Sequence, residues 1–131
     1  MPKLYPSWIE IPVKDLERAT AFYRAVFGLT DTPLYDDPPA KIVVLLASDK
    51  SIRQPGVSLV LSPLHHPADG GVVINFHVDT HAALAAALEQ VKALGGKLDH
   101  EMVDMDDGVH YINLLDCEGN RIALSSYEEI G

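Results

Sequence analysis

The chain has 131 residues, of which 47% are hydrophobic and 22% charged, and its formal net charge is -9 at pH 7. This length and composition predict one globular domain over residues 1–131. The acidic charge, without a basic stripe, argues against a nucleic-acid partner, and no apolar run is long enough to span a membrane. The single cysteine excludes an internal disulfide, and no secretory signal opens the sequence, so we expect a cytoplasmic protein.

The first half begins with a strand that leads into a capped helix. Residues 8–13 alternate apolar and polar side chains, which is typical of a half-buried strand. Asp15 can cap the helix that follows, whose apolar stripe runs from Leu16 to Phe27. Gly28 suits the left-handed residue that ends such a helix.

Three further strands are predicted before a linker. They cover residues 29–35, 41–47 and 57–62, with a turn at 36–39. Residues 63–71 hold two prolines and two glycines without an apolar period, which predicts a linker between two half-domains.

The second half repeats this order. Residues 72–78 alternate as a strand, Asp79 or Thr80 can cap a helix over 82–94, and strands follow at 97–103, 109–115 and 121–126. A shift of 65 positions lays Val13 on Val78 and aligns the halves. The sequence therefore predicts an α+β fold of two β-α-β-β-β modules, at about 7–62 and 72–127.

Two motifs in this repeat resemble a known superfamily. P-V-K-D-L-E-R-A-T-A-F-Y-R-A-V-F-G-L is similar to the first-helix signature of the vicinal oxygen chelate proteins, and D-C-E-G-N-R-I-A-L resembles their closing D-P-x-G-N-x-I-E-L motif. This superfamily contains glyoxalase I, bleomycin-resistance proteins and extradiol dioxygenases, and the chain is most similar to its small glyoxalase-like branch. The resemblance implies a homodimer and a glyoxalase-like fold, in which the sheets curl into a half-barrel around a cavity and the helices cover the outside.

Strand alternation predicts which side chains face the cavity. The uniformly apolar positions should pack under the helices; they are Ile9, Ile11, Val57, Leu59, Leu61, Ile74, Phe76, Ile112, Leu114, Ile122 and Leu124. The opposite positions mix polar, aromatic and small residues, which suits a ligand pocket. From this set we predict the substrate-binding residues Trp8, Ser58, Val60, Asn75, Tyr111, Asn113 and Ser125.

The resemblance also implies where glyoxalase-type metal ligands would stand. Aligned on the two motifs, these positions are Trp8, Ser58, Val73 and Ala123. None is a good ligand for a divalent metal, which prefers imidazole, carboxylate or thiolate. We therefore predict no metal and no cofactor at these positions. A displaced site built from Glu10, His77 and a third group such as His110 stays open as an alternative.

His77 is the best candidate for acid–base chemistry, since imidazole titrates near neutral pH. Glu10 has the same inward orientation in the first module and would orient the ring as a neighbouring carboxylate. The simpler interpretation is that both only line the pocket. Trp8 could stack on a planar or cationic ligand or merely fill the cavity.

These observations predict a small-molecule-binding protein that lacks the usual metal ligands and uses His77 and Glu10 if it is an enzyme. The first alternative is a ligand-sequestering protein of the bleomycin-resistance type, for which the acidic charge would suit a cationic ligand. The second is a metal-dependent lyase or dioxygenase with a relocated site.

Overall fold

The computed structural model describes residues 5–130, and the predicted repeat organises them. The first module contains, in chain order, β1 (Trp8–Pro12), α1 (Leu16–Phe27), β2 (Leu34–Asp37), β3 (Ala40–Leu46), the short 3-10 helix η1 (Lys50–Ile52) and β4 (Gly56–Leu61). The second contains β5 (Ile74–Val78), α2 (His81–Ala93), β6 (Lys97–Leu98), β7 (Val103–Asp104), β8 (Val109–Leu115) and β9 (Arg121–Tyr127). Both helices and their predicted order are confirmed.

Each module forms its own sheet with the same topology. The strand orders are β1-β4-β3-β2 and β5-β9-β8-β6, and β7 pairs with β8. The first strand of each module runs parallel to the last, with Glu10 opposite Ser58 and Asn75 opposite Ala123. These pairs are related by the shift that aligns the two halves of the sequence, so the repeat extends to strand register.

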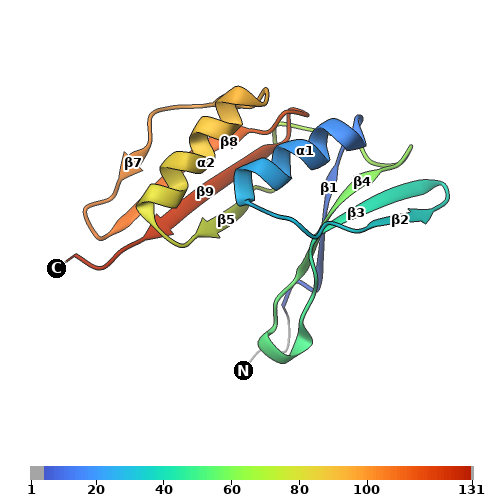
Figure 1. Ribbon diagram of the computed structural model, residues 1–131, viewed down its shortest axis with the longest axis horizontal. Helices are drawn as coiled ribbons and strands as arrows, with labels where there is room; N and C mark the ends of the chain where they lie inside the picture. Colours follow the sequence, from blue (N-terminus) through green and yellow to red (C-terminus); the bar gives the residue numbers. More distant parts are fainter. Residues whose placement is uncertain (1–4, 131) are drawn as a thin grey trace.

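The two helices lie side by side and pack on the two sheets, which remain open and do not close a barrel among residues 5–130 (Figure 1). The helix ends follow the predicted signals. Asp15 accepts a hydrogen bond from the Arg18 amide at 3.1 Å, and Gly28 ends α1 with a φ of 65°. Thr80 caps α2 by accepting from the Ala83 amide at 3.0 Å. No helix in the part of the chain that the structure describes is long and apolar enough to cross a membrane.

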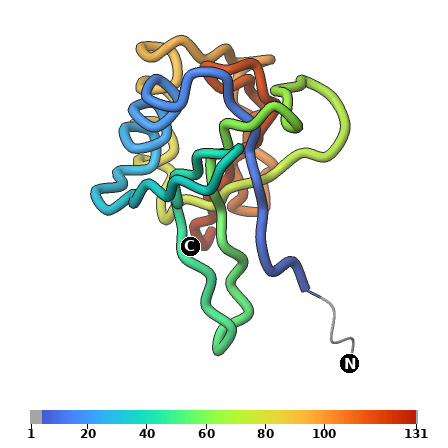
Figure 2. Tube along the Cα trace, turned by 90° about the vertical axis from the view of Figure 1, so that its right-hand side faces the viewer, coloured from blue at the N-terminus to red at the C-terminus, as the bar shows by residue number. Residues whose placement is uncertain are grey.

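One apolar core joins both modules. Every residue predicted to face the helices is buried or packs against this core, including Ile11, Leu59, Ile112 and Leu124. Both modules contribute side chains to it, because α1 and α2 lie against each other along one side of the molecule (Figure 2). The predicted alternation of core-facing positions is confirmed.

Two of the predicted strands were placed wrongly. The strand predicted at 29–35 is β2, which begins at Leu34 and includes Asp36 and Asp37 of the predicted turn. It starts late because the Arg24 side chain donates to the Thr30 carbonyl, and Pro33 has no N–H for a strand ladder. The strand predicted at 97–103 is split into the short strands β6 and β7.

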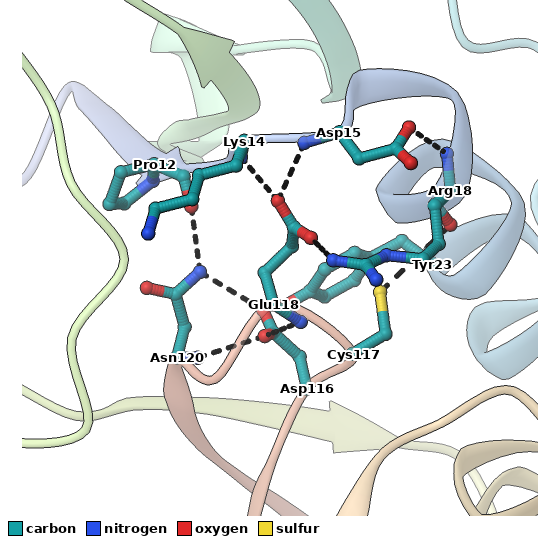
Figure 3. A network of polar contacts seen from close by, with 9 residues as sticks. All are labelled: Pro12, Lys14, Asp15, Arg18, Tyr23, Asp116, Cys117, Glu118 and Asn120. Atoms are coloured by element: carbon teal, nitrogen blue, oxygen red, sulfur yellow. Dashed lines mark hydrogen bonds and ion pairs between the residues drawn. The ribbon is translucent and has the colours of Figure 1, made fainter.

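A hydrogen-bond network around the closing turn of the second module holds the start of the first helix (Figure 3). The Glu118 carboxylate is buried; it accepts from the backbone amides of Lys14 and Asp15 and pairs with the Arg18 guanidinium. Asn120 donates from Nδ2 to the Pro12 carbonyl at 2.7 Å. The two sequence motifs therefore contact each other and fix one module on the other.

Candidate ligand site

The face of each sheet that points away from the helices is called here its open face. On the first sheet it carries Trp8 and Glu10, two residues apart on β1, and both side chains are exposed. The Trp8 indole lies across the neighbouring strand over Gly56, where a Cβ would come within 1.9 Å of the ring carbon Cζ3. Glycine at position 56 thus leaves room for the indole, which forms an aromatic wall on this face.

The linker between the modules adds a residue to this face that the sequence did not predict. His65 follows a turn in which its amide donates to the Ser62 carbonyl at 3.3 Å. Its Nε2 lies 3.5 Å from Oε1 of Glu10, and both side chains are about a third exposed, at 36% and 39%. Only the Ser62-Pro63 pair, a turn signal directly after β4, points to this return of the chain.

Ser58 stands beside Glu10 in the register of the first sheet and is fully buried. Its Oγ has no hydrogen-bond partner among the described residues. Val60, two residues on, is also buried, at 1% exposure. Both predicted binding residues therefore lie beneath the surface of this face, with Trp8 and Glu10 exposed beside them.

The open face of the second sheet is more polar. Ser125 donates from Oγ to Oδ1 of Asn75 at 3.0 Å, and its strand neighbours in register are His77 and Tyr111. The structure thus brings four predicted site residues together on β5, β8 and β9. His77 is exposed on β5, at the edge of the sheet.

Asn113 has a partner that the sequence did not indicate. Nε2 of His100 lies 3.3 Å from the Asn113 amide nitrogen and 3.4 Å from its Nδ2. The His100 ring also meets Tyr111 edge to face, with 6.2 Å between ring centroids. His100 follows the short strand β6, and its contact depends on the break in the predicted strand.

The proposed pairing of Glu10 with His77 is not formed. Glu10 belongs to the first sheet and contacts His65, and no ion pair joins it to His77 in the part of the chain described. His110 lies on the helix side of its sheet, where its ring stacks on His81 with centroids 3.5 Å apart. Within the described residues of one chain, Glu10, His77 and His110 are therefore not brought together as the relocated metal site considered above requires.

His110 instead belongs to a polar cluster at the start of α2. Its Nε2 lies 3.5 Å from Oδ2 of Asp104, and Nδ1 of His81 lies 2.6 Å from Oγ of Ser126. A hydrogen bond from the Asp106 amide, helped by the His110 ring, holds the pKa of Asp104 below its usual range. These groups are on the opposite side of the sheet from the predicted binding residues.

The open faces are not enclosed in a single chain. Cavities of about 600 and 230 Å³ include His77 and Glu10, respectively, in their walls. The predicted binding residues line none of the main cavities described for residues 5–130; these residues are Trp8, Ser58, Val60, Asn75, Tyr111, Asn113 and Ser125. A pocket built from them needs a further surface to close it.

The fold agrees with the comparison to known proteins. The chain belongs to the Glyoxalase/Bleomycin resistance protein/Dioxygenase superfamily, whose model matches residues 6–124. No curated protein matches the sequence significantly.

Solved structures show the same fold at low sequence identity. The fosfomycin resistance protein FosX from Listeria monocytogenes, crystallised with Mn(II) and sulfate, is 20% identical with a TM-score of 0.65, covering 98% of this chain and 95% of that one. A glyoxylase/bleomycin resistance protein/dioxygenase domain from Frankia sp. EAN1pec is 10% identical with a TM-score of 0.74, covering 99% and 96%. A glyoxalase/bleomycin resistance protein from Albidiferax ferrireducens T118 is 20% identical with a TM-score of 0.67, covering 93% and 98%.

A relative with bound Mn(II) raises the question of whether this chain has equivalent ligands. At the implied positions, the Trp8 ring covers Gly56, and Ala123 is buried without a donor atom. Ser58 and Val73 offer no imidazole or carboxylate. No group of three or more His, Cys, Asp or Glu within residues 5–130 is arranged to hold a metal ion. The residues at these positions do not fit a catalytic divalent metal.

Proposed function

We propose that this protein binds a small organic molecule on the open faces of its sheets, without a metal at the glyoxalase-type positions. The observation that carries the proposal is the Trp8 indole lying over Gly56. At the position where a metal-binding relative would have a ligand, this chain has an exposed aromatic ring. The ring can stack on a planar molecule but has no atom to coordinate a metal.

The groups around Trp8 favour a ligand with a planar or cationic part. The Glu10 carboxylate is exposed two residues away on the same strand face, and an aromatic ring beside a carboxylate is a usual environment for organic cations. The net charge of -9 would attract such a ligand and repel anions. A site of this kind suits a ligand-sequestering protein.

We further propose that a second copy of the chain closes the pocket and that the homodimer acts in the cytoplasm. Support for the second copy comes from the open faces, whose polar and aromatic side chains are not enclosed by the described residues of one chain. In this proposal, both modules of each chain act as one domain over residues 1–131.

A second candidate function is acid–base catalysis at the same site. His77 is exposed at the sheet edge and lies opposite Ser125, whose hydroxyl already holds Asn75. An imidazole beside hydrogen-bonding groups can move a proton to or from a bound molecule. Glu10 would serve as the second group, from the first sheet.

The binding proposal can be tested through Trp8, which is the only tryptophan of the chain. Titration with a flat aromatic cation such as thioflavin T should quench Trp8 emission more strongly than an anion of similar size such as 8-anilinonaphthalene-1-sulfonate. Glu10→Gln should weaken the effect of the cation by about two- to fivefold, which corresponds to one exposed ion pair. Equal quenching by both dyes, or an unchanged response in Glu10→Gln, would contradict a cation site.

Elemental analysis of protein purified without an affinity tag tests the metal assignment. We expect less than stoichiometric Mn, Fe, Ni and Zn. Stoichiometric metal that is lost in Glu10→Gln or His77→Ala would establish the relocated metal site instead. For a compound that quenches Trp8, His77→Ala separates the two functions: loss of turnover with binding retained indicates an enzyme, and weaker binding without any turnover indicates sequestration.

A further inference from the structure

The cavity of about 600 Å³ that has His77 in its wall lies on the helix side of the molecule, at the junction of the two modules. Its volume is within the range of small-molecule sites. The walls come from the end of α1, the β3 and β4 strands, β5 and α2. The cavity is distinct from the open-face site and shares only His77 with it.

The inner wall of this cavity is apolar and well packed. Phe27 of the first module and Phe76 of the second are in contact, with ring centroids 4.9 Å apart at 51°. Val26 and Val57, also in the wall, are only 5% and 4% exposed. These side chains belong to the shared core, so they form a firm surface for an apolar group.

The α2 side of the cavity is open because it carries small residues. Ala83, Ala86 and Ala87 face the space at helical spacing, where larger side chains would fill it. Ala83 and Ala86 are exposed even though they lie beside the aromatic wall. The space is therefore accessible from solvent.

Polar groups lie only at the mouth, and one of them is charged. Asp79 follows β5 directly, and its side chain has no hydrogen bond or ion pair among the described residues. His77 and Gln90 are the other polar residues in the wall. An unpaired carboxylate at the mouth of an apolar cavity matches a ligand with an apolar body and a cationic end.

We propose that this junction cavity binds a small amphipathic amine. Its hydrocarbon or aromatic body lies against Phe27 and Phe76, and its ammonium group pairs with Asp79. The volume suits one drug-sized molecule. The proposal does not depend on the function of the open faces.

Dansylcadaverine, a fluorescent aromatic amine, is a suitable probe because its emission rises and shifts to the blue in apolar surroundings. It should bind more tightly than neutral dansylamide or anionic dansylglycine. Ala86→Leu should weaken binding about tenfold, because the added side chain takes up the cavity. Ala82→Leu, on the same helix but outside the cavity wall, is the matched control and should bind like the wild type.

Asp79→Asn tests the charged end separately. It should reduce the affinity for dansylcadaverine about two- to fivefold and leave dansylamide unchanged. Circular dichroism and thermal melting establish that each variant is folded.

Three results would overturn the proposal: no binding to the wild type, equal affinity for the three probes, or binding that survives Ala86→Leu. Trp8→Ala distinguishes the two sites. If Trp8→Ala abolishes probe binding and Ala86→Leu does not, the probe occupies the open face. The junction-cavity proposal is then wrong, and the open-face function is supported.

Discussion

The Tyr23 hydroxyl of α1 donates a hydrogen bond to Oδ2 of Asp116, in the turn before β9, at 2.6 Å. Oδ1 of Asp116 accepts from the amides of Glu118 and Asn120 at 2.8 and 2.9 Å. Because all three groups donate, the carboxylate needs no proton of its own, although burial raises the pKa of Asp116 above its usual value. One side chain thus connects the first helix to the turn that closes the fold.

Removing the Tyr23 hydroxyl should destabilise the protein without changing its fold. Tyr23→Phe keeps the ring and its edge contact with Phe22 but removes one donor from a buried carboxylate. We expect a loss of about 1.5–3 kcal/mol in the free energy of unfolding, measured by urea denaturation. Tyr127→Phe, at a half-exposed position, is the control and should change little. A loss below about 0.5 kcal/mol in Tyr23→Phe would show that the bond is not stabilising.

The same phenol should make the protein sensitive to alkaline pH. Burial, together with the nearby Asp116, raises the pKa of Tyr23 well above the usual value of 10.0. The folded state therefore keeps a proton that the unfolded chain releases above about pH 10, so stability is full below that pH and falls as the pH rises. The slope from Tyr23 should approach about 1.4 kcal/mol per pH unit.

Urea denaturation between pH 8 and 11 measures this slope. Tyr23→Phe should lose less stability over that range than the wild type, and the difference should appear only above about pH 10. Parallel curves for the two proteins would contradict the assignment.

Glycine at position 56 should be required by Trp8. Gly56→Ala places a methyl group within the indole ring, so the ring must move away from its strand neighbour. We expect a destabilisation of about 1–3 kcal/mol and a red shift of Trp8 emission. Gly70→Ala, where a Cβ would meet nothing within 4 Å, should have neither effect.

A double-mutant cycle isolates this contact. If the indole is the obstacle, Gly56→Ala should cost much less in a Trp8→Ala background, since a methyl group then has room. Equal costs in both backgrounds would assign the glycine a backbone role instead.

The parts of the fold that local chemistry determines were predictable. Asp15, Thr80 and Gly28 give the helix ends, and strand alternation separates Ile11 and Leu59 from Glu10 and Ser58. These signals depend only on residues that are close together in the sequence, so one sequence is enough to reveal them. The late start of β2 required knowing that Arg24 folds back on Thr30, a contact across a loop.

The site was less predictable because its contacts join distant segments. Glu10 and His77 have the same inward orientation on the first strand of their modules, but each belongs to a different sheet, so the shared orientation did not bring them together. His65 reaches Glu10 only because the linker turns back after β4. Likewise, the alternation of β8 correctly separates His110 from Tyr111, but it does not indicate that His110 stacks on His81.

Cys117 should be an inert thiol in the folded protein. It lies in the turn beside Asp116, and burial together with that carboxylate raises its pKa from 9.0 to about 11. At pH 8 the folded thiol should therefore be ionised about a hundredfold less than in the unfolded chain, and the thiolate is the reactive form.

Labelling with 5,5′-dithiobis(2-nitrobenzoic acid) is unambiguous because the chain has one cysteine. We expect labelling to be at least about a hundredfold slower in native protein than in urea. Rapid stoichiometric labelling of the native protein would contradict this environment and would make Cys117 a candidate nucleophile.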